Sequence, residues 1–398
     1  MHDPLKTVCS RAWTDLNIDF YLNRWRYCCK AVWAPIPEEY DHTYFIDNPY
    51  LKKMREELLT GIETPACEWC WHDYKETGHA WRDISNIWKN TSIKNILLQT
   101  KHYNIPSQFV LTFDNICDQS CLYCGPENST KWAKELNDRK NIGINQNIKK
   151  QIDALTKWLA TVSGEFTFQI LGGEPTYSHN FYYFLEQLKL NNILENSNIT
   201  MSITTNGNTI KSSMEKLLKI INSASWKWHI GLSNEACGEI GENIRYGLNM
   251  KRFENNLKLY LNTPNISRIV FSPTMNALNV KNFHEYIKLM HSIILSTNKE
   301  KEITWVGNWV NYQPAELDCK FLPNHFSNYI DKAIEVMKNT STDLNMDDNS
   351  DVYSWLNNMK TRIHNPEEDL NIITNYVDHL SHIKPLLNKQ ILLDQLHD

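Results

Sequence analysis

Residues 109–125 read FVLTFDNICDQSCLYCG and join a strand pattern to a dense group of cysteines. The first five residues are β-branched, aliphatic and aromatic in alternation, which predicts a strand. Cys117, Cys121 and Cys124 then follow at the spacing C-x3-C-x2-C, in a loop that precedes the next expected helix. Three thiols this close together indicate a metal site.

Two kinds of metal site are compatible with this loop. Iron–sulfur clusters are normally held by four thiolates, so a loop that supplies three leaves one iron open to an outside ligand. The alternative is structural zinc, which is closed tetrahedrally and is usually built from two C-x2-C knuckles, so that a distant fourth ligand would be needed here. The spacing favours the cluster and leaves zinc open.

The loop, with Tyr123 directly before its third cysteine, resembles the signature of the radical S-adenosylmethionine (AdoMet) superfamily. Two later strand ends strengthen that resemblance. Residues 165–171 predict a strand that ends in Gly172, Gly173, Glu174 and Pro175, similar to the GGEP motif of the family. Residues 199–204 predict another, which runs into Thr205, Asn206 and Gly207. Each of these two strand-end motifs alone is an ordinary turn signal. The resemblance therefore rests on the occurrence of three motifs in order, each after a predicted strand.

The resemblance implies a catalytic site. The three cysteines would bind three irons of a [4Fe-4S] cluster, and AdoMet would chelate the fourth iron. Tyr123 is expected beside the adenine, and Gly173, Glu174 and the neighbouring backbone at the amino group. One electron, from a donor such as flavodoxin or ferredoxin, would cleave AdoMet to methionine and a 5′-deoxyadenosyl radical, which abstracts hydrogen from the substrate.

Four residues beyond these motifs are further candidate contacts to AdoMet or substrate. By the same resemblance, Ser233 and Glu235 close the fourth expected strand near the ribose or the substrate. Arg245 suits bidentate capture of the AdoMet carboxylate, and Asn276 would line the adenine pocket. As ordinary alternatives, Glu235 could be a solvated acid in a loop, Arg245 a surface arginine, and Asn276 a residue that stabilises a turn.

A second group of cysteines lies near the N-terminus. Residues 16–21 and 25–27 predict a β-hairpin with Cys9 before it and Cys28 after it, and Cys67 and Cys70 form a C-x2-C knuckle. A helix over residues 38–60 is expected between hairpin and knuckle. Together these four thiols form a candidate cage for an auxiliary [4Fe-4S] cluster. The alternatives are a zinc site or buried cysteines that bind no metal. The adjacent Cys29 could replace Cys28 as the ligand at the end of the hairpin, although the resemblance favours Cys28.

This group resembles the SPASM or Twitch auxiliary-cluster module of radical AdoMet proteins, with two departures. Ala12 replaces the usual proline, and Asn23 stands where a turn glycine is expected, a replacement that asparagine tolerates because it reaches positive φ readily. The module also comes before the catalytic domain. That order, with Glu76, Gly78 and Arg82, resembles Twitch-containing radical AdoMet proteins of phage and environmental genomes.

From residue 109 onward, predicted strands alternate with helices. The strands are expected at 109–113, 165–171, 199–204, 226–232, 268–272 and 303–306. Such alternation predicts an α/β fold with a parallel sheet, and the resemblance implies a partial (β/α)6 barrel of the TIM type. The expected division is an auxiliary-cluster module at 1–104, the radical AdoMet barrel at 105–315 and a C-terminal helical extension at 316–398.

Composition narrows the class of protein. The net charge is −5 with a pI near 6.3 and no run of basic residues, which argues against nucleic acid as a partner. No stretch approaches 18 apolar residues and the first 30 residues lack a signal core, so we expect no membrane partner and a cytoplasmic location. In that compartment ten cysteines are better explained by metal sites than by disulfides.

The sequence therefore predicts a radical AdoMet enzyme, but its substrate is less sharply indicated. A peptide or protein side chain is the first hypothesis, because SPASM and Twitch relatives frequently modify such substrates. A nucleotide, sugar or other small metabolite is the second. The non-enzymatic alternative is a binding module that is stabilised by zinc and has no catalytic activity.

Overall fold

The computed structural model describes residues 7–41, 43–45, 47–77, 106–138, 145–193, 198–297, 301–310, 314–344, 350–364 and 368–397. They form an α/β fold with a mostly parallel sheet, as the alternation of strands and helices predicts. The chain divides into two compact units. The first contains Met1–Asp114, Ile144–Leu171 and His179–Met201, and the second contains Asn115–Gly143, Gly172–Ser178 and Ser202–Asp398.

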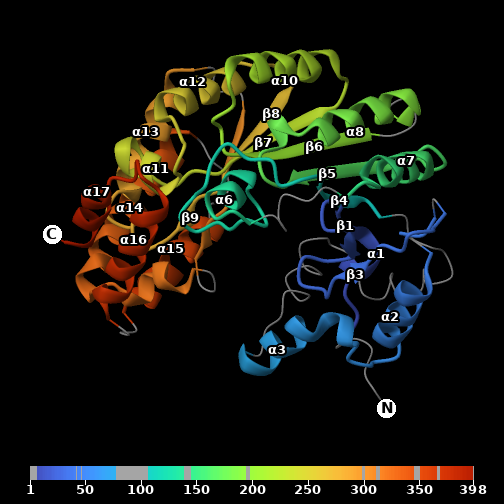
Figure 1. Ribbon diagram of the computed structural model, residues 1–398, viewed down its shortest axis with the longest axis horizontal. Helices are drawn as coiled ribbons and strands as arrows, with labels where there is room; N and C mark the ends of the chain where they lie inside the picture. Colours follow the sequence, from blue (N-terminus) through green and yellow to red (C-terminus); the bar gives the residue numbers. More distant parts are fainter. Residues whose placement is uncertain are drawn as a thin grey trace. The chain divides into compact units, whose positions relative to one another are not determined.

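The sheet of the first unit combines the predicted hairpin with the first parallel strands (Figure 1). Its strands are β1 (Asp15–Asp19), β2 (Arg24–Arg26), β3 (Ala34–Pro35), β4 (Gln108–Thr112) and β5 (Glu165–Leu171). Strand β2 is antiparallel to β1 and β3, whereas β4 is parallel to both β1 and β5. The hairpin is confirmed, and Asn23 takes a φ of +52° in its turn.

Short and medium helices accompany these strands in the described part of the unit. They are α1 (Arg11–Thr14), α2 (Pro49–Leu59), the 3-10 helix η2 (Pro65–Cys67), α3 (Glu68–Thr77), α7 (Ile148–Leu159) and α8 (His179–Leu190). We expected a helix over residues 38–60, and its first part is wrong. The helix begins only at Pro49, because the Asn48 side chain accepts a hydrogen bond from the Leu51 amide and proline favours the first helical position.

Apolar side chains at alternate positions of β4 and just after it, Phe109, Leu111 and Phe113, lie in the core of this unit. Phe109 is 1% exposed and stacks on Phe168, with ring centroids 5.0 Å apart. Phe113, just after the strand, stacks on Phe20 at 5.3 Å. Burying such rings contributes a few kcal/mol each, so the pattern that predicts the strand also fixes which of its faces is buried.

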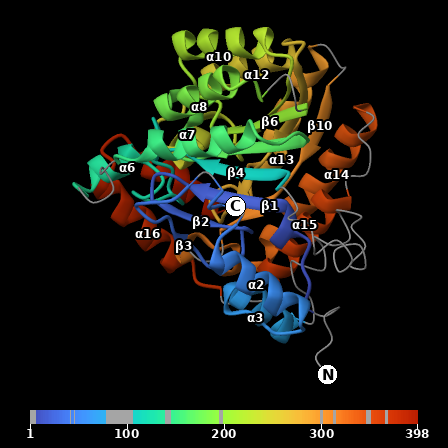
Figure 2. The ribbon, with the colours of Figure 1, turned by 90° about the vertical axis from the view of Figure 1, so that its right-hand side faces the viewer.

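The second unit continues the alternation of strands and helices. Strands β6 (Asn198–Thr205), β7 (Lys227–Leu232), β8 (Ile266–Phe271) and β10 (Glu302–Trp305) lie in that order, and β8 is parallel to β7 and β10. In two views at right angles, α10 (Lys211–Ser223) and α12 (Met250–Leu261) run along one side of these strands (Figure 1, Figure 2). Two short strands, β9 (Thr274–Met275) and β11 (Asn308–Trp309), pair separately.

The remaining helices of the second unit fall into two groups along the sequence. Those before residue 300 are α6 (Thr130–Glu135), η4 (Pro175–Tyr177), α11 (Gly238–Ile244) and α13 (Phe283–Leu295). The later ones are η5 (Ala315–Leu317), η6 (Cys319–Phe321), η7 (Asn324–Phe326), α14 (Ser327–Asp343), α15 (Ser350–Ile363), α16 (Leu370–Ile383), α17 (Lys389–Leu393) and η8 (Asp394–Leu396). The helical character predicted for the C-terminal region is confirmed.

The curvature of a partial barrel and the three-part division of the chain stay predictions. The expected boundary between residues 104 and 105 lies outside the described residues, and so do Gly78 and Arg82. None of the helices in the described ranges combines the length and apolar character that crossing a membrane requires.

Candidate active site

The three cysteines of the signature loop are free thiols in the second unit. Cys121 is buried, and Cys117 and Cys124 are partly exposed. Burial raises the pKa of the Cys117 thiol well above its ordinary value, and the neighbouring Cys121 raises it further. The pKa of Cys124 is raised to about 12 by the same two causes. The metal-free loop therefore holds three protonated thiols near one another, and metal binding would displace their protons.

These thiols fit the donor set that an open iron–sulfur cluster requires. Three cysteines on one loop supply three thiolates and leave one iron position for another ligand. In the described part of the chain, no three or more His, Cys, Asp or Glu side chains form a group that could hold a single metal ion as it stands.

The backbone around Cys121 is fixed from several directions. The amide of Ser120 donates to the carbonyl of Tyr246 at 2.9 Å, and the amide of Leu122 donates to the carbonyl of Ile244 at 2.8 Å. Two side chains complete the set by donating to loop carbonyls: Trp132 Nε1 to Cys121 at 2.8 Å, and the Tyr376 hydroxyl to Leu122 at 2.8 Å. The loop backbone is therefore held by four hydrogen bonds to other segments of the second unit.

Glu174 joins the two motifs that follow β5 and β6. Its carboxylate accepts hydrogen bonds from the Thr176 amide at 3.1 Å, the Thr205 hydroxyl at 2.8 Å and the Asn206 amide at 2.7 Å. The side chain is fully buried, and this burial raises its pKa to about 7. Because the carboxylate already accepts three hydrogen bonds from the protein, the backbone next to Glu174 is the part of this motif that could bind a ligand.

Gly173 lies directly against the cysteine loop. A Cβ atom at this position would stand 2.3 Å from the Ile116 carbonyl oxygen and 2.6 Å from that of Asn115, closer than real Cβ atoms approach backbone. The next amide, of Glu174, donates to the same Ile116 carbonyl at 2.6 Å. Gly172 has a φ of +135°, which favours glycine, and Pro175 begins η4. Gly173 is thus required by the close approach of two loops, and Gly172 is favoured by its positive φ.

Asp118 connects the cysteine loop to the Asn-Gly motif, and we did not predict it. Its two carboxylate oxygens accept hydrogen bonds from Asn206 Nδ2 and Asn208 Nδ2, each at 2.7 Å. Asn208 was missed as well. With Glu174, these contacts bring the cysteine loop and both strand-end motifs together in one unit.

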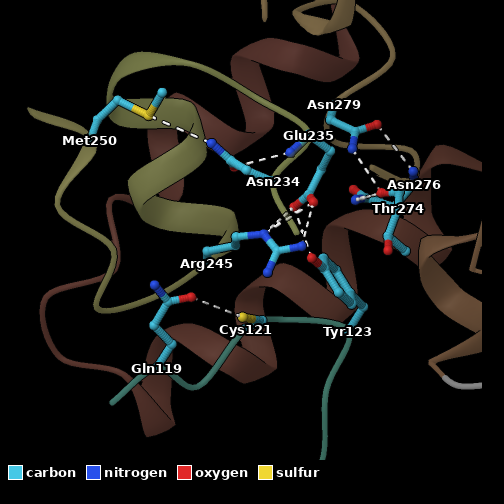
Figure 3. A network of polar contacts seen from close by, with 10 residues as sticks. All are labelled: Gln119, Cys121, Tyr123, Asn234, Glu235, Arg245, Met250, Thr274, Asn276 and Asn279. Carbon is cyan, nitrogen blue, oxygen red and sulfur yellow. Dashed lines mark hydrogen bonds and ion pairs between the residues drawn. The ribbon is translucent and has the colours of Figure 1, made fainter. Parts of the chain in front are cut away.

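Tyr123, Glu235 and Arg245 meet in a triad in which Glu235 and Arg245 are buried and Tyr123 is half-buried (Figure 3). Arg245 Nη2 donates to Glu235 Oε2 at 2.7 Å, Nε donates to both carboxylate oxygens, and the Tyr123 hydroxyl donates to Glu235 Oε1 at 2.9 Å. Burial alone would lower the pKa of Arg245, but Glu235 and Tyr123 outweigh it and hold that pKa well above its ordinary value. The three predicted contact residues are thus brought together, and two of them are paired with each other.

Ser233 and Asn276 are the remaining candidates. Ser233 is partly exposed, and its amide donates to the Thr205 carbonyl at 2.9 Å, which places it beside the Asn-Gly motif. Asn276 is buried, and its side chain bonds to the Thr274 carbonyl at 3.1 Å and the Leu278 amide at 3.1 Å (Figure 3). The Asn276 side chain therefore has the turn role that we gave as its alternative.

The second group of cysteines lines a cavity in the first unit. Cys9, Cys28, Cys67 and Cys70 all line one pocket. Burial raises the pKa of Cys9 to about 12, and Cys67 and Cys70 contribute to the rise. Cys29, by contrast, is exposed. The fold thus gathers into one cavity four thiols that come from both ends of the predicted hairpin and from the knuckle.

Tyr27 and Trp71 help to line this cavity. The Tyr27 hydroxyl lies 2.6 Å from the Cys67 sulfur, and the Trp71 indole donates to the Thr64 carbonyl at 2.8 Å. The thiol environment is therefore largely aromatic and apolar, with a hydroxyl donor available to one sulfur.

Comparison with known proteins identifies the region that contains the signature loop. Residues 111–290 match the family model described as the Radical SAM superfamily. No curated protein matches the chain.

Several solved structures are similar to the chain at low identity. The structure described as histidine-tagged anSMEcpe with bound AdoMet has 18% identity and a TM-score of 0.37, and the match covers 56% of this chain and 58% of that one. Streptococcus suis SuiB bound to S-adenosylmethionine has 15% identity and a TM-score of 0.35, with 78% and 53% covered. A second SuiB structure has 16% identity and a TM-score of 0.31, with 67% and 64% covered. The match spans less than two thirds of each of these chains.

The family match covers the three-cysteine loop, both strand-end motifs and the triad of Tyr123, Glu235 and Arg245. It therefore assigns a radical SAM superfamily domain to residues 111–290 of this chain.

Proposed function

We propose that this protein is a radical AdoMet enzyme whose catalytic [4Fe-4S] cluster is held by Cys117, Cys121 and Cys124. The observation that carries the proposal is the joining of the three-cysteine loop to the GGEP and Asn-Gly motifs through Glu174 and Asp118. These contacts use backbone amides, the fully buried Glu174 and the half-buried Asp118, so the chain itself holds the three motifs together.

When bound, the cluster and AdoMet supply reductive cleavage of the sulfonium and a radical that takes hydrogen from the substrate. The chain's own residues hold the parts in place. Cys117, Cys121 and Cys124 would bind the irons, and Gly173, Glu174 and the neighbouring backbone would hold the amino group of AdoMet. The buried Arg245 keeps its charge in the triad, and Tyr123 beside it offers an aromatic face.

We further propose that Cys9, Cys28, Cys67 and Cys70 hold an auxiliary [4Fe-4S] cluster in a Twitch- or SPASM-like module. The cavity lined by these four thiols supports this assignment, and the position of Cys28 in its wall favours Cys28 over the exposed Cys29. Four protein ligands would close every iron corner, which suits electron transfer. The partial barrel, the three-part division of the chain, a cytoplasmic location and a flavodoxin- or ferredoxin-type electron donor belong to the same proposal.

The substrate class that we propose is a peptide or protein side chain, on the resemblance of the cysteine module to peptide-modifying relatives. The test compares the stimulation of AdoMet cleavage by a peptide fraction and by a small-metabolite fraction of the source cell. Stimulation by peptides, lost after protease treatment, is the expected result. Stimulation by metabolites alone would shift the assignment to a nucleotide, sugar or related compound.

The activity itself is tested by anaerobic reconstitution followed by an assay of AdoMet cleavage in the reduced protein. We expect a brown protein with about eight irons, and formation of 5′-deoxyadenosine. Cys121→Ala should lose about four irons and all cleavage. Cys319→Ala is the matched control, because Cys319 is buried in η6 and has no proposed ligand role. A colourless protein with stoichiometric zinc, or intact cleavage in Cys121→Ala, would contradict the proposal.

A further inference from the structure

Gln119 occupies the middle of the cysteine loop, between Cys117 and Cys121. It is 1% exposed, and its main chain is anchored because the Ser129 hydroxyl donates to its carbonyl at 2.6 Å. Its own amide donates to the Cys117 sulfur at 3.5 Å. One N–H group of this residue therefore already points at a proposed cluster ligand.

The side chain of Gln119 faces the second ligand. The Cys121 thiol donates to Gln119 Oε1 at 3.6 Å (Figure 3). The other end of the same amide, Nε2, is buried and has no hydrogen-bond partner among the described residues. A buried NH2 group without an acceptor costs free energy, so the arrangement is satisfied on only one side.

Binding of a cluster changes which of these groups can donate. A cysteine that ligates iron is a thiolate, so its sulfur has no proton and acts only as an acceptor. Gln119 Oε1 then loses its donor. Because the amide oxygen and nitrogen are nearly equal in size, a half-turn about the last side-chain bond places Nε2 where Oε1 stood, within reach of the sulfur. The unpartnered donor and the new acceptor satisfy each other.

We propose that Gln119 donates a side-chain hydrogen bond to the Cys121 thiolate and thereby raises the reduction potential of the AdoMet-binding cluster. The inference rests on the proposed function. Hydrogen bonds to ligand sulfurs favour the reduced, more negative state of an iron–sulfur cluster, so they raise its potential. Gln119 is a positioning and tuning residue, and it does not touch AdoMet or substrate in this scheme.

The first test is an electrochemical titration of the reconstituted protein, monitored by electron paramagnetic resonance. Gln119→Met keeps the length of the side chain and removes the donor. We expect the midpoint potential of the AdoMet-responsive signal to become more negative, so that its reduced fraction falls severalfold at the wild-type midpoint. The auxiliary signal should not move. Gln169→Met, at an exposed position of β5, is the matched control and should titrate as the wild type does.

A second measurement uses the wild-type chain and does not depend on how the variant folds. With glutamine side-chain nitrogens labelled with 15N, pulsed paramagnetic resonance of the reduced cluster should show a 15N coupling that Gln119→Met lacks. An unchanged potential in a fully loaded variant, or no 15N coupling in the wild type, would overturn the inference and leave the proposed function intact. A wild-type protein with no AdoMet-responsive cluster would instead overturn the proposed function.

Discussion

Lys384 Nζ lies 2.6 Å from Glu135 Oε2, and this ion pair joins the end of α16 to α6. The Lys384 side chain is completely buried, donates to the Ser120 hydroxyl at 2.7 Å and lies 3.5 Å above the centroid of the Trp132 ring. Ser120 is the residue directly before Cys121. The C-terminal helices therefore contact the cysteine loop from a position 264 residues away in sequence.

Loss of this cation should weaken the second unit. In Lys384→Met the Glu135 carboxylate, whose side chain is 18% exposed, loses its cationic partner and keeps only the Ser120 hydroxyl, and we expect the free energy of unfolding to fall by about 3 kcal/mol. Urea unfolding of the metal-free protein measures this change. Lys211→Met removes an exposed pair with Glu215 and should change it by less than about 0.5 kcal/mol. Equal effects of the two variants would contradict the role of burial.

Gly173→Ala should separate the GGEP motif from the cysteine loop. The added methyl group would meet the Ile116 carbonyl oxygen at 2.3 Å, so one of the two loops must move. We expect AdoMet binding to weaken at least about tenfold, as measured by equilibrium binding to the reconstituted protein. Gly164→Ala is the control, because its methyl group would only touch the Phe166 ring at 3.6 Å. Wild-type affinity in Gly173→Ala would show that the close approach is not needed.

Glu174 should make the stability of the metal-free protein depend on pH. Burial raises its pKa to about 7 from an ordinary value of 4.5, so the folded protein holds this proton more tightly than the unfolded chain does. The stabilisation that this proton gives the folded state is complete below pH 4.5 and is lost as the pH rises through 7. Between these values the free energy of unfolding should fall by about 1 kcal/mol per pH unit.

Urea unfolding at several pH values measures that slope. Glu174→Gln should flatten it, because glutamine has no proton to lose. Glu165→Gln changes an exposed carboxyl at the start of β5 and serves as the control. The interpretation is wrong if the slope in Glu174→Gln equals that of the wild type.

Arg245→Lys should destabilise the protein even without AdoMet. Lysine keeps the charge but cannot make the forked contact with Glu235, and the loss of one charged hydrogen bond costs about 2 kcal/mol. Thermal unfolding of the metal-free protein measures this cost. Arg268→Lys alters a more exposed pair with Glu302 and should cost less than about 1 kcal/mol. If only AdoMet binding responds to Arg245→Lys, the arginine does not serve the fold.

The order of strands and helices could be predicted from the sequence because it depends on local periodicity, whereas the metal-binding roles of the cysteine groups stay predictions. The β4 residues Phe109 and Leu111 are buried as the alternation requires. The start of α2 was missed because a proline and its cap outweighed a loosely helical pattern. Lys384, Asp118 and Gln119 were missed for another reason. Their importance comes from contacts with distant or irregular backbone, and no period or spacing records such contacts.

The central claim is that the cluster held by Cys117, Cys121 and Cys124 leaves one iron for AdoMet. Electron–nuclear double resonance on the reduced protein, with AdoMet labelled with 15N at its amino group, tests it most directly. The account predicts a 15N hyperfine coupling that shows a nitrogen bound to iron and that is absent in Cys121→Ala. A reduced cluster that shows no such coupling at saturating AdoMet would contradict the account.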